Sequence, residues 1–324
     1  MNRERLEQGQ IPIYFAAVTV AALGGVLAPA VFQAMAVLVT PAIALLMYAM
    51  FLQIPFLALR QGLSDRRFVV ALMVANFVLV PMLVWALTRS LVDHPALLVG
   101  ALLVLLTPCI DYVVVFTHIG RGDSQRMLAA TPLLLLLQLL LLPLYLSLML
   151  EAGAPLVIAI EPFVEAFLVL IVLPLVLAVI TCDAGRRWQT VQRWNSAWAW
   201  APVPAMAIVL VVVIGSQIDF VMRELGRLLP VVPVYLGFMV LAPLLGALAA
   251  WMVRLPAGTA RSVVFSSSTR NSLVVLPLAL ALPEGVRELA AAAVITQTLV
   301  ELMSELIYIR AVPSLIWRKR RPPP

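Results

Sequence analysis

Charged residues are scarce in this chain of 324 residues. Only 12% of them are Asp, Glu, Lys or Arg, whereas 63% are hydrophobic, and the mean hydropathy is +1.06. A soluble domain of this length needs a polar surface that such a composition cannot supply. The sequence therefore excludes a soluble globular protein and indicates an integral membrane protein.

Cysteine and histidine are rare as well, with two residues of each. Cys109 and Cys182 imply no disulfide framework, and the sequence has no cluster of Cys, His and acidic residues spaced as metal ligands. A nucleotide-binding loop and a nucleophile elbow are also missing, and Cys109 with Asp111 makes a poor nucleophile–base pair. We therefore expect neither an enzyme nor a bound cofactor.

Long apolar runs dominate the rest of the chain. A membrane core about 30 Å thick needs roughly 20 apolar residues per helix. The connections between the runs are short, so we expect an all-α membrane protein with a single integral membrane domain. The runs predict ten transmembrane helices, at about residues 12–30, 36–58, 68–90, 97–118, 125–150, 157–181, 197–216, 229–252, 260–282 and 287–311.

The distribution of basic residues supports an even number of spans. If the N-terminus is cytoplasmic, the inner segments hold most of the 22 Lys and Arg residues and the outer loops hold few. This bias is what the positive-inside rule requires. We therefore expect a protein of the cell membrane with both termini in the cytoplasm. The net charge of +6 follows from this topology and requires no nucleic-acid partner.

Two polar segments interrupt the apolar pattern at corresponding places. Thr107–Asp111 lies in the fourth predicted span, and Ser266–Ser272 lies in the ninth, which is the fourth span of the second half. Five spans per half force the two halves, residues 1–152 and 153–324, into opposite orientations. Paired interruptions in such an inverted repeat point to a binding site at the middle of the membrane, so we expect a transporter.

Each interruption carries an ionisable residue, Asp111 in the first and Arg270 in the second. A charge at membrane depth costs roughly 2.5–3.5 kcal/mol on insertion scales and usually marks a pathway or a site. Two roles for Arg270 stay open. It forms an ion pair with Asp111 that holds the broken helices together, or it replaces a coupling cation or holds an anionic substrate. Ser268 also has two interpretations, a substrate contact or a hydroxyl bonded to a carbonyl one turn back.

The residues of the first interruption resemble the fourth helix of the arsenite efflux permeases, a branch of the bile acid:sodium symporter superfamily. In both, a Pro-Cys pair, here Pro108-Cys109, precedes an apolar stretch that ends in a basic residue, Gly and Asp, here Arg121-Gly122-Asp123. Residues 265–271 resemble the ninth-helix signature of these permeases, which places Asn271 on a shared Asn. Residues 298–302 resemble their tenth-helix motif, which places Glu301 on an acidic residue.

This resemblance implies a five-plus-five inverted repeat in which discontinuous helices 4 and 9 cross, with panel-like and core subdomains that move relative to each other. It implies arsenical resistance by an antiporter that exports arsenite in exchange for protons. Cys109 then matches the single essential thiol of the permeases, and As(III) is a soft ion that prefers thiolate. A buried structural cysteine is the alternative.

The chain departs from both branches of the superfamily at its intramembrane charges. Asp111 and Arg270 are additional to the permease pattern. The sodium-coupled branch places an amide that binds the ion where this chain has Arg270, and a guanidinium there repels sodium. We therefore expect proton coupling through Asp111 or Glu301. The alternative function is a sodium-independent or sodium-coupled transporter of an organic anion, with Arg270 as the counter-charge.

The tenth predicted span adds a polar stripe. Glu301 and Glu305 lie four residues apart and share a helix face with Gln297. Glu305 either continues a polar pathway or reaches the inner interface near Arg310. The expected partners are a small-molecule or metalloid substrate, protons and membrane lipid. The residues expected to bind substrate are Cys109, which would also bind the soft metalloid, Ser268, Arg270 and Asn271.

Overall fold

The computed structural model describes residues 10–53, 65–110, 112–150, 165 and 168–315. Most of these residues are helical, and no strand occurs among them. The chain forms two compact units, and each takes segments from both halves of the sequence. Unit 1 consists of Met1–Gln53, Ile158–Arg227 and Leu280–Pro283, and unit 2 consists of Ile54–Val157, Leu228–Ala279 and Glu284–Pro324.

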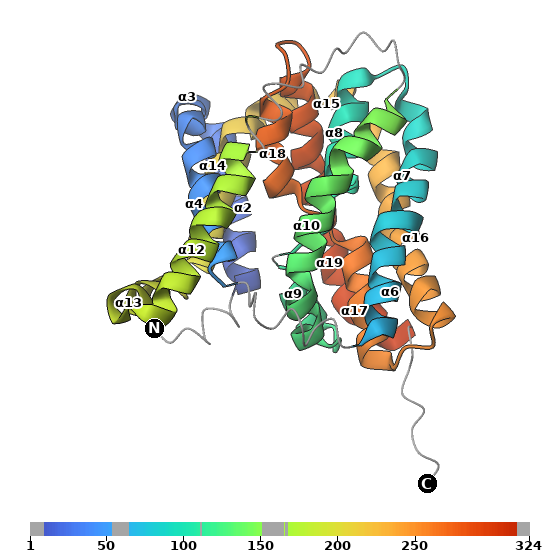
Figure 1. The fold of residues 1–324 in the computed structure, drawn as a ribbon. Coiled ribbons are helices and arrows are strands. Elements are labelled where there is room, and N and C mark those ends of the chain that lie inside the picture. The colour runs from blue at the N-terminus through green and yellow to red at the C-terminus, as the bar shows by residue number, and fades with distance from the viewer. Residues whose placement is uncertain (1–9, 54–64, 111, 151–164, 166–167, 316–324) are drawn as a thin grey trace. The chain divides into compact units, whose positions relative to one another are not determined.

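Unit 1 is built around the pairing of two long helices. Helix α2 packs along α14, and α4 packs against both α12 and α14 (Figure 1). A Cβ added to Gly25 on α2 would lie 2.5 Å from the carbonyl oxygen of Gly215 on α14, so glycine permits this close approach. The elements are α2 (Gln10–Leu27), α3 (Pro29–Ala34), η1 (Met35–Leu38), α4 (Val39–Phe51), η4 (Leu168–Val172), α12 (Leu173–Arg187), α13 (Gln189–Trp198), α14 (Pro202–Arg223) and α15 (Leu225–Leu228), whose last residue belongs to unit 2.

Unit 2 holds the remaining helices. Helix α16 packs along α17, and α19 packs along α8 (Figure 1). Two of its helices begin at an aspartate whose side chain accepts a backbone N–H, Asp65 from Phe68 and Asp123 from Arg126. The elements are α6 (Arg66–Val74), η2 (Ala75–Leu79), α7 (Val80–Thr88), η3 (Arg89–Leu91), α8 (Pro95–Leu105), α9 (Val113–Ile119), α10 (Ser124–Met149), α16 (Val231–Met252), α17 (Ala257–Ser268), α18 (Ser272–Leu280) and α19 (Arg287–Leu315).

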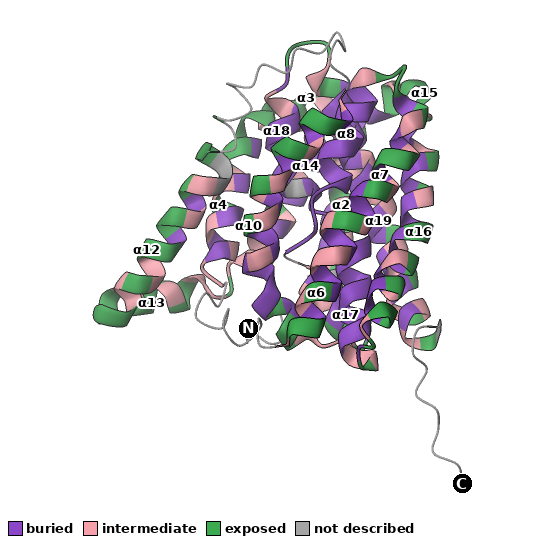
Figure 2. Cartoon of the chain, turned by 45° about the vertical axis from the view of Figure 1, so that its right-hand side comes forward, coloured by how far each residue is buried: buried purple, intermediate pink, exposed green. Residues whose placement is uncertain are grey.

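The core of unit 2 lies around α8 and α17. Every residue of α8 after Pro95 and every residue of α17 after Gly258 is buried, as the purple colour in Figure 2 indicates. A helix that is apolar all round, such as α8, has no face for a polar solvent and is expected inside. Helix α17 is different, because it also buries hydroxyl groups that must find partners there.

Outer helices of unit 2 present apolar stripes to their surroundings. On α10, residues four apart on one face are exposed, namely Leu136, Leu140, Leu144 and Leu148, and Leu140 and Leu148 are each 71% exposed. Contiguous exposed apolar surface of this kind is unfavourable in water and suits a lipid environment. The same spacing recurs on α16, at Leu236, Val240, Leu244 and Leu248.

Six helical stretches in the described residues are long and apolar enough to cross a membrane: Pro29–Phe51, Arg66–Leu91, Ser124–Met149, Pro202–Arg223, Val231–Met252 and Arg287–Ser314. Two shorter apolar helices, Pro12–Leu27 and Pro95–Leu105, coincide with further predicted spans. The prediction of an all-helical, multi-pass membrane protein is therefore confirmed. The count of ten spans and the division at residue 152 stay predictions.

The fourth and ninth predicted spans are both interrupted. Helix α8 ends at Leu105 and α9 begins at Val113, whereas α17 ends at Ser268 and α18 begins at Ser272. Polar residues and Pro108 were the sequence signals for these breaks, and the helices end beside them.

A third irregularity lies in the π-helical turn η2. Pro81 has no N–H to donate to the carbonyl of Phe77 one turn earlier. The hydroxyl of Tyr145 on α10 donates to that carbonyl instead, at 2.7 Å. The turn also contains Asn76, which is fully buried.

Close packing of α16 on α17 gives a first prediction. A Cβ on Gly246 would meet the hydroxyl of Ser267 and would lie 2.9 Å from the Cα of Val264, which is backbone and cannot move aside cheaply. We expect Gly246→Ala to lower the free energy of unfolding by about 1–3 kcal/mol, as overpacking does. Thermal unfolding in detergent measures the effect. Gly258→Ala on α17 is the control, because nothing lies within 4 Å of its Cβ, and equal melting temperatures of the two variants would contradict the packing argument.

Candidate functional site

The two helix breaks are joined by their backbones. The N–H of Cys109 donates to the carbonyl of Thr269 at 3.0 Å, and the N–H of Asn271 donates to the carbonyl of Thr107 at 2.8 Å. A break leaves peptide groups without helical partners, and a membrane offers no water to satisfy them. Antiparallel pairing of the breaks supplies those partners within unit 2. We call these paired segments the crossover.

The middle residues of the crossover are Pro108 and Arg270, which face each other in an antiparallel bridge. The backbone of Arg270 is satisfied from two other elements. Its N–H donates to Oε2 of Glu301 on α19 at 2.9 Å, and its carbonyl accepts the hydroxyl of Tyr112 at 3.0 Å. Glu301, the acidic residue of the predicted polar stripe, thus contacts the second break directly.

Glu301 is fully buried and surrounded by donors. The hydroxyl of Tyr112 lies 2.6 Å from Oε1 of Glu301, and Nε2 of Gln297 donates to Oε2 at 2.5 Å. Together with the N–H of Arg270, these contacts fix both oxygens of the carboxyl group. Glu301 therefore connects α19 to the crossover through hydrogen bonds rather than through an ion pair with the guanidinium.

Glu305 lies one helical turn further along α19 and is also fully buried. Its Oε1 is 2.7 Å from the hydroxyl of Thr269, the crossover residue whose carbonyl accepts from Cys109. Its Oε2 has no hydrogen-bond partner among the described residues. Of the two roles considered for Glu305, the structure supports the continuation of the polar stripe, because the carboxyl group points to the crossover and not to Arg310.

The side chain of Arg270 points to a different group of atoms. Its Nη2 donates to Oδ1 of Asn76 at 2.9 Å and to the carbonyl of Ser266 at 2.5 Å, and its Nη1 donates to the carbonyl of Leu105 at 3.4 Å. The guanidinium carbon also lies 5.5 Å from the ring centre of Phe238. Asp111 is outside the described residues, so the ion pair with Asp111, one of the two roles left open for Arg270, stays untested.

Cys109 is fully buried in the crossover. Its N–H donates to the carbonyl of Thr269, the residue before Arg270. The thiol expected to bind a soft ion thus lies among the polar groups of the crossover.

Two other predicted substrate ligands have local bonds. The hydroxyl of Ser268 donates to the carbonyls of Val264 and Phe265 in its own helix, which matches the structural interpretation of this serine. Oδ1 of Asn271 accepts the N–H of Val274 at 3.3 Å and so caps α18. Nδ2 of Asn271 is buried and has no partner among the described residues.

Sequence reasoning missed Asn76, Tyr112 and Thr269 as members of this site. Asn76 was detectable as a single amide within an apolar span, five residues before a proline. Tyr112 and Thr269 carry hydroxyl groups within or next to the interruptions, but nothing in the sequence indicates that they contact α19.

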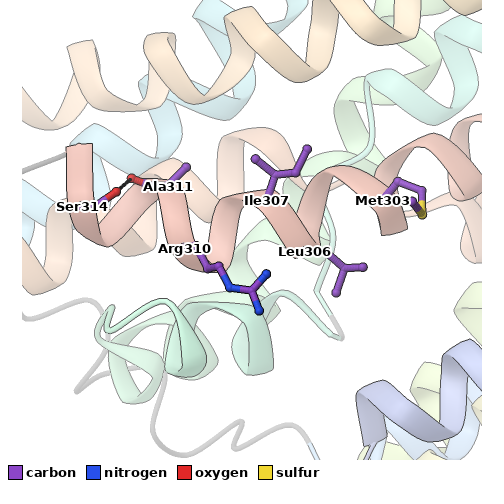
Figure 3. A pocket seen from close by; sticks show the side chains of 6 residues that line it. All are labelled: Met303, Leu306, Ile307, Arg310, Ala311 and Ser314. Atoms are coloured by element: carbon purple, nitrogen blue, oxygen red, sulfur yellow. Dashed lines mark hydrogen bonds between the residues drawn. The ribbon is translucent and has the colours of Figure 1, made fainter.

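A groove of about 550 Å³ follows α19 beyond the two acids. Figure 3 shows its lining side chains, with the guanidinium of Arg310 extending away from the helix. None of the crossover residues lines this groove. It is formed by Met303, Leu306, Ile307, Arg310, Ala311 and Ser314.

An all-helical protein with several apolar spans, and with two broken helices that meet at buried polar groups, has the construction of a membrane transporter. The chain matches the Sodium Bile acid symporter family over residues 40–224, which is more than half of its length. The chain belongs to this family, and it is a transporter of the bile acid symporter type. None of the curated proteins compared with it matches. The superfamily suggested by the sequence motifs is confirmed, whereas the arsenite branch stays a prediction.

The contacts of Tyr112 give a second prediction. Tyr112→Phe removes the hydroxyl from both Glu301 and the carbonyl of Arg270, and each loses a buried hydrogen bond. We expect the free energy of unfolding to fall by about 1–3 kcal/mol, measured by thermal unfolding in detergent. Tyr48→Phe is the matched control, since the contacts of its hydroxyl, with Thr181 at 3.1 Å and Trp194 at 3.3 Å, lie within unit 1. A melting temperature of Tyr112→Phe at or above that of the control would contradict the prediction.

Proposed function

We propose that this protein is a secondary active transporter that exchanges its cargo for protons, with Glu301 as the proton-binding group. One observation carries the proposal. The oxygen of the Tyr112 hydroxyl lies 2.6 Å from Oε1 of Glu301 and 3.0 Å from the carbonyl oxygen of Arg270. A phenol has a single proton, and a carbonyl has none. Both contacts are full hydrogen bonds only when the carboxyl group supplies a second proton.

The protonated form of Glu301 fits all of its contacts. Its O–H donates to Tyr112, which then donates to the carbonyl of Arg270, while Oε2 accepts from Gln297 and from the N–H of Arg270. When the proton leaves, the Tyr112 hydroxyl turns to the carboxylate, and the carbonyl of Arg270 loses its donor. Protonation of Glu301 therefore decides whether the carbonyl of Arg270 in the crossover has a hydrogen-bond donor. Coupling requires such a link between the bound proton and the backbone.

Glu305 repeats this arrangement one turn away. The hydroxyl of Thr269 lies 2.7 Å from Oε1 of Glu305 and 2.6 Å from the carbonyl of Phe265. One hydroxyl proton again stands between two acceptors, and a protonated carboxyl group completes both bonds. Burial of two negative charges one helical turn apart is costly unless a proton or a cation accompanies them. Asp111 remains a second candidate for coupling.

For the fold, we propose the ten-span inverted repeat, with α8 and α9 as the fourth span and α17 and α18 as the ninth. Unit 2, which contains both broken helices, would be the core subdomain and unit 1 the panel. The excess of basic residues in the predicted inner segments supports cytoplasmic termini in a cell membrane.

For the cargo, we propose a thiophilic metalloid such as arsenite, which the transporter exports. Two observations support this proposal. Cys109 is the cysteine of unit 2, and it is fully buried within the crossover, where its N–H donates to the carbonyl of Thr269. The guanidinium of Arg270 is already engaged by three oxygens, so it is less suited than the thiol to receive an organic anion.

Arsenite sensitivity tests the cargo. An efflux-deficient host that expresses the wild type should grow at arsenite concentrations that stop the empty host. Cys109→Ser should abolish the protection, because a hydroxyl is a poor ligand for a soft ion. Cys182→Ser, in unit 1, is the control and should protect like the wild type. No protection by the wild type would exclude the metalloid, and anion uptake would then be measured.

Proton coupling is tested in vesicles with an imposed pH gradient. Glu301→Gln keeps donors and acceptors that imitate the protonated acid, so we expect a folded protein whose transport no longer responds to the gradient. Glu288→Gln, on the exposed first turn of the same helix, should respond like the wild type. If Glu301→Gln responds fully and Asp111→Asn does not, Asp111 is the coupling group instead of Glu301.

A further inference from the structure

The guanidinium of Arg270 lies in a cage of neutral oxygens. The three acceptors are Oδ1 of Asn76 and the carbonyls of Ser266 and Leu105, and all belong to unit 2. No carboxylate accepts a hydrogen bond from this guanidinium among the described residues. The Nε of Arg270 is buried without a partner, and the residue has 0% exposure. The side chain is thus held as a buried cation and not as one half of a described ion pair.

The origin of these oxygens explains why a cation is stable among them. Leu105 is the last residue of α8, and Ser266 lies in the last turn of α17. Carbonyls at the end of a helix have no partners in the helix and carry the negative end of its dipole. Two helices that end at breaks therefore direct partial negative charge to one place.

The third oxygen is fixed in orientation. Nδ2 of Asn76 donates to the carbonyl of Leu72 at 3.1 Å and to the hydroxyl of Ser266 at 3.0 Å, which leaves Oδ1 for Arg270. The face of the Phe238 ring adds a further attraction for positive charge. The cage thus recognises positive charge through amide oxygens, helix ends and an aromatic face.

We propose that these groups form a site for a monovalent cation and that Arg270 occupies it permanently. The side chain supplies a tethered cation where a dissolved one would otherwise bind, so this place in the protein needs no sodium. The conclusion that coupling needs no sodium at this place rests on the proposed exchange for protons, whereas the existence of the cation site does not. Removal of the guanidinium leaves the three oxygens without a donor and opens the cage to a small cation.

Chemical rescue tests the site directly. Purified Arg270→Ala should melt several degrees below the wild type. Guanidinium, sodium or potassium chloride at millimolar concentration should raise its melting temperature, whereas choline chloride at equal ionic strength should not, because choline is too large. The wild type should respond equally to all four salts. A melting temperature of Arg270→Ala that is the same in all four salts overturns the proposal.

Two further variants test whether the rise in melting temperature with salt depends on the cage around Arg270. Asn76→Leu in the Arg270→Ala background removes one oxygen and should abolish the rescue. Arg261→Ala is the matched control, because Arg261 lies on α17, the helix that ends just before Arg270, and donates to the carbonyls of Arg121 and Pro313. It should show no difference between the salts, and a response equal to that of Arg270→Ala would overturn the proposal.

Arg270→Gln is the second test if Arg270→Ala does not fold. The amide can still donate to the carbonyls but carries no charge, so its melting temperature should also rise with sodium or guanidinium. If neither variant can be recovered in any of these salts, or neither responds to them, the proposal fails. These measurements detect cation binding through the melting temperature and do not measure transport. Their failure leaves proton exchange through Glu301 standing, and an unaltered pH response of Glu301→Gln leaves the cation site standing.

Discussion

The backbone pairing of the two helix breaks is the constraint on which the rest of unit 2 depends. Peptide groups that leave a helix inside a membrane need partners from the protein. Cys109 and Asn271 provide two such bonds, and side chains provide the others. The hydroxyl of Tyr112 and the carboxyl group of Glu301 satisfy the two backbone groups of Arg270. An acidic residue at this depth is therefore a structural component of the break as well as a candidate for chemistry.

The same hydrogen bonds link stability to charge. Glu301 and Glu305 each contact a hydroxyl group that already has a second acceptor. In the proposed exchange for protons, the number of protons at the crossover decides how many backbone groups are satisfied. The guanidinium of Arg270 takes no part in this arrangement. The backbone N–H of Arg270 donates to Glu301, whereas its guanidinium donates to carbonyls at helix ends. One residue thus joins the proposed proton-binding group to a guanidinium held by neutral oxygens.

Much of this arrangement was predictable from the sequence. Apolar runs predicted the helices, and Pro108 and the Ser-rich segment predicted the two breaks, because these signals act within a few residues. The partners of the polar groups were not predictable. Asn76 bonds Arg270 across 194 residues, and Tyr112 bonds Glu301 across 189. Such pairs depend on how helices pack, and apolar periodicity does not determine that packing. Ser268 is the converse case, since its bonds to Val264 and Phe265 are local.

The crossover also has a consequence for biosynthesis. Its first segment leaves the ribosome well before its second, since more than 150 residues separate Thr107 from Asn271. Until the second half of the chain arrives, the carbonyl of Thr107 and the N–H of Cys109 lack their final partners. Until then, these backbone groups need temporary hydrogen-bond partners, such as groups of the insertion machinery or water in a more hydrated part of the bilayer. Correct assembly of this membrane protein is completed only when its last helices are inserted.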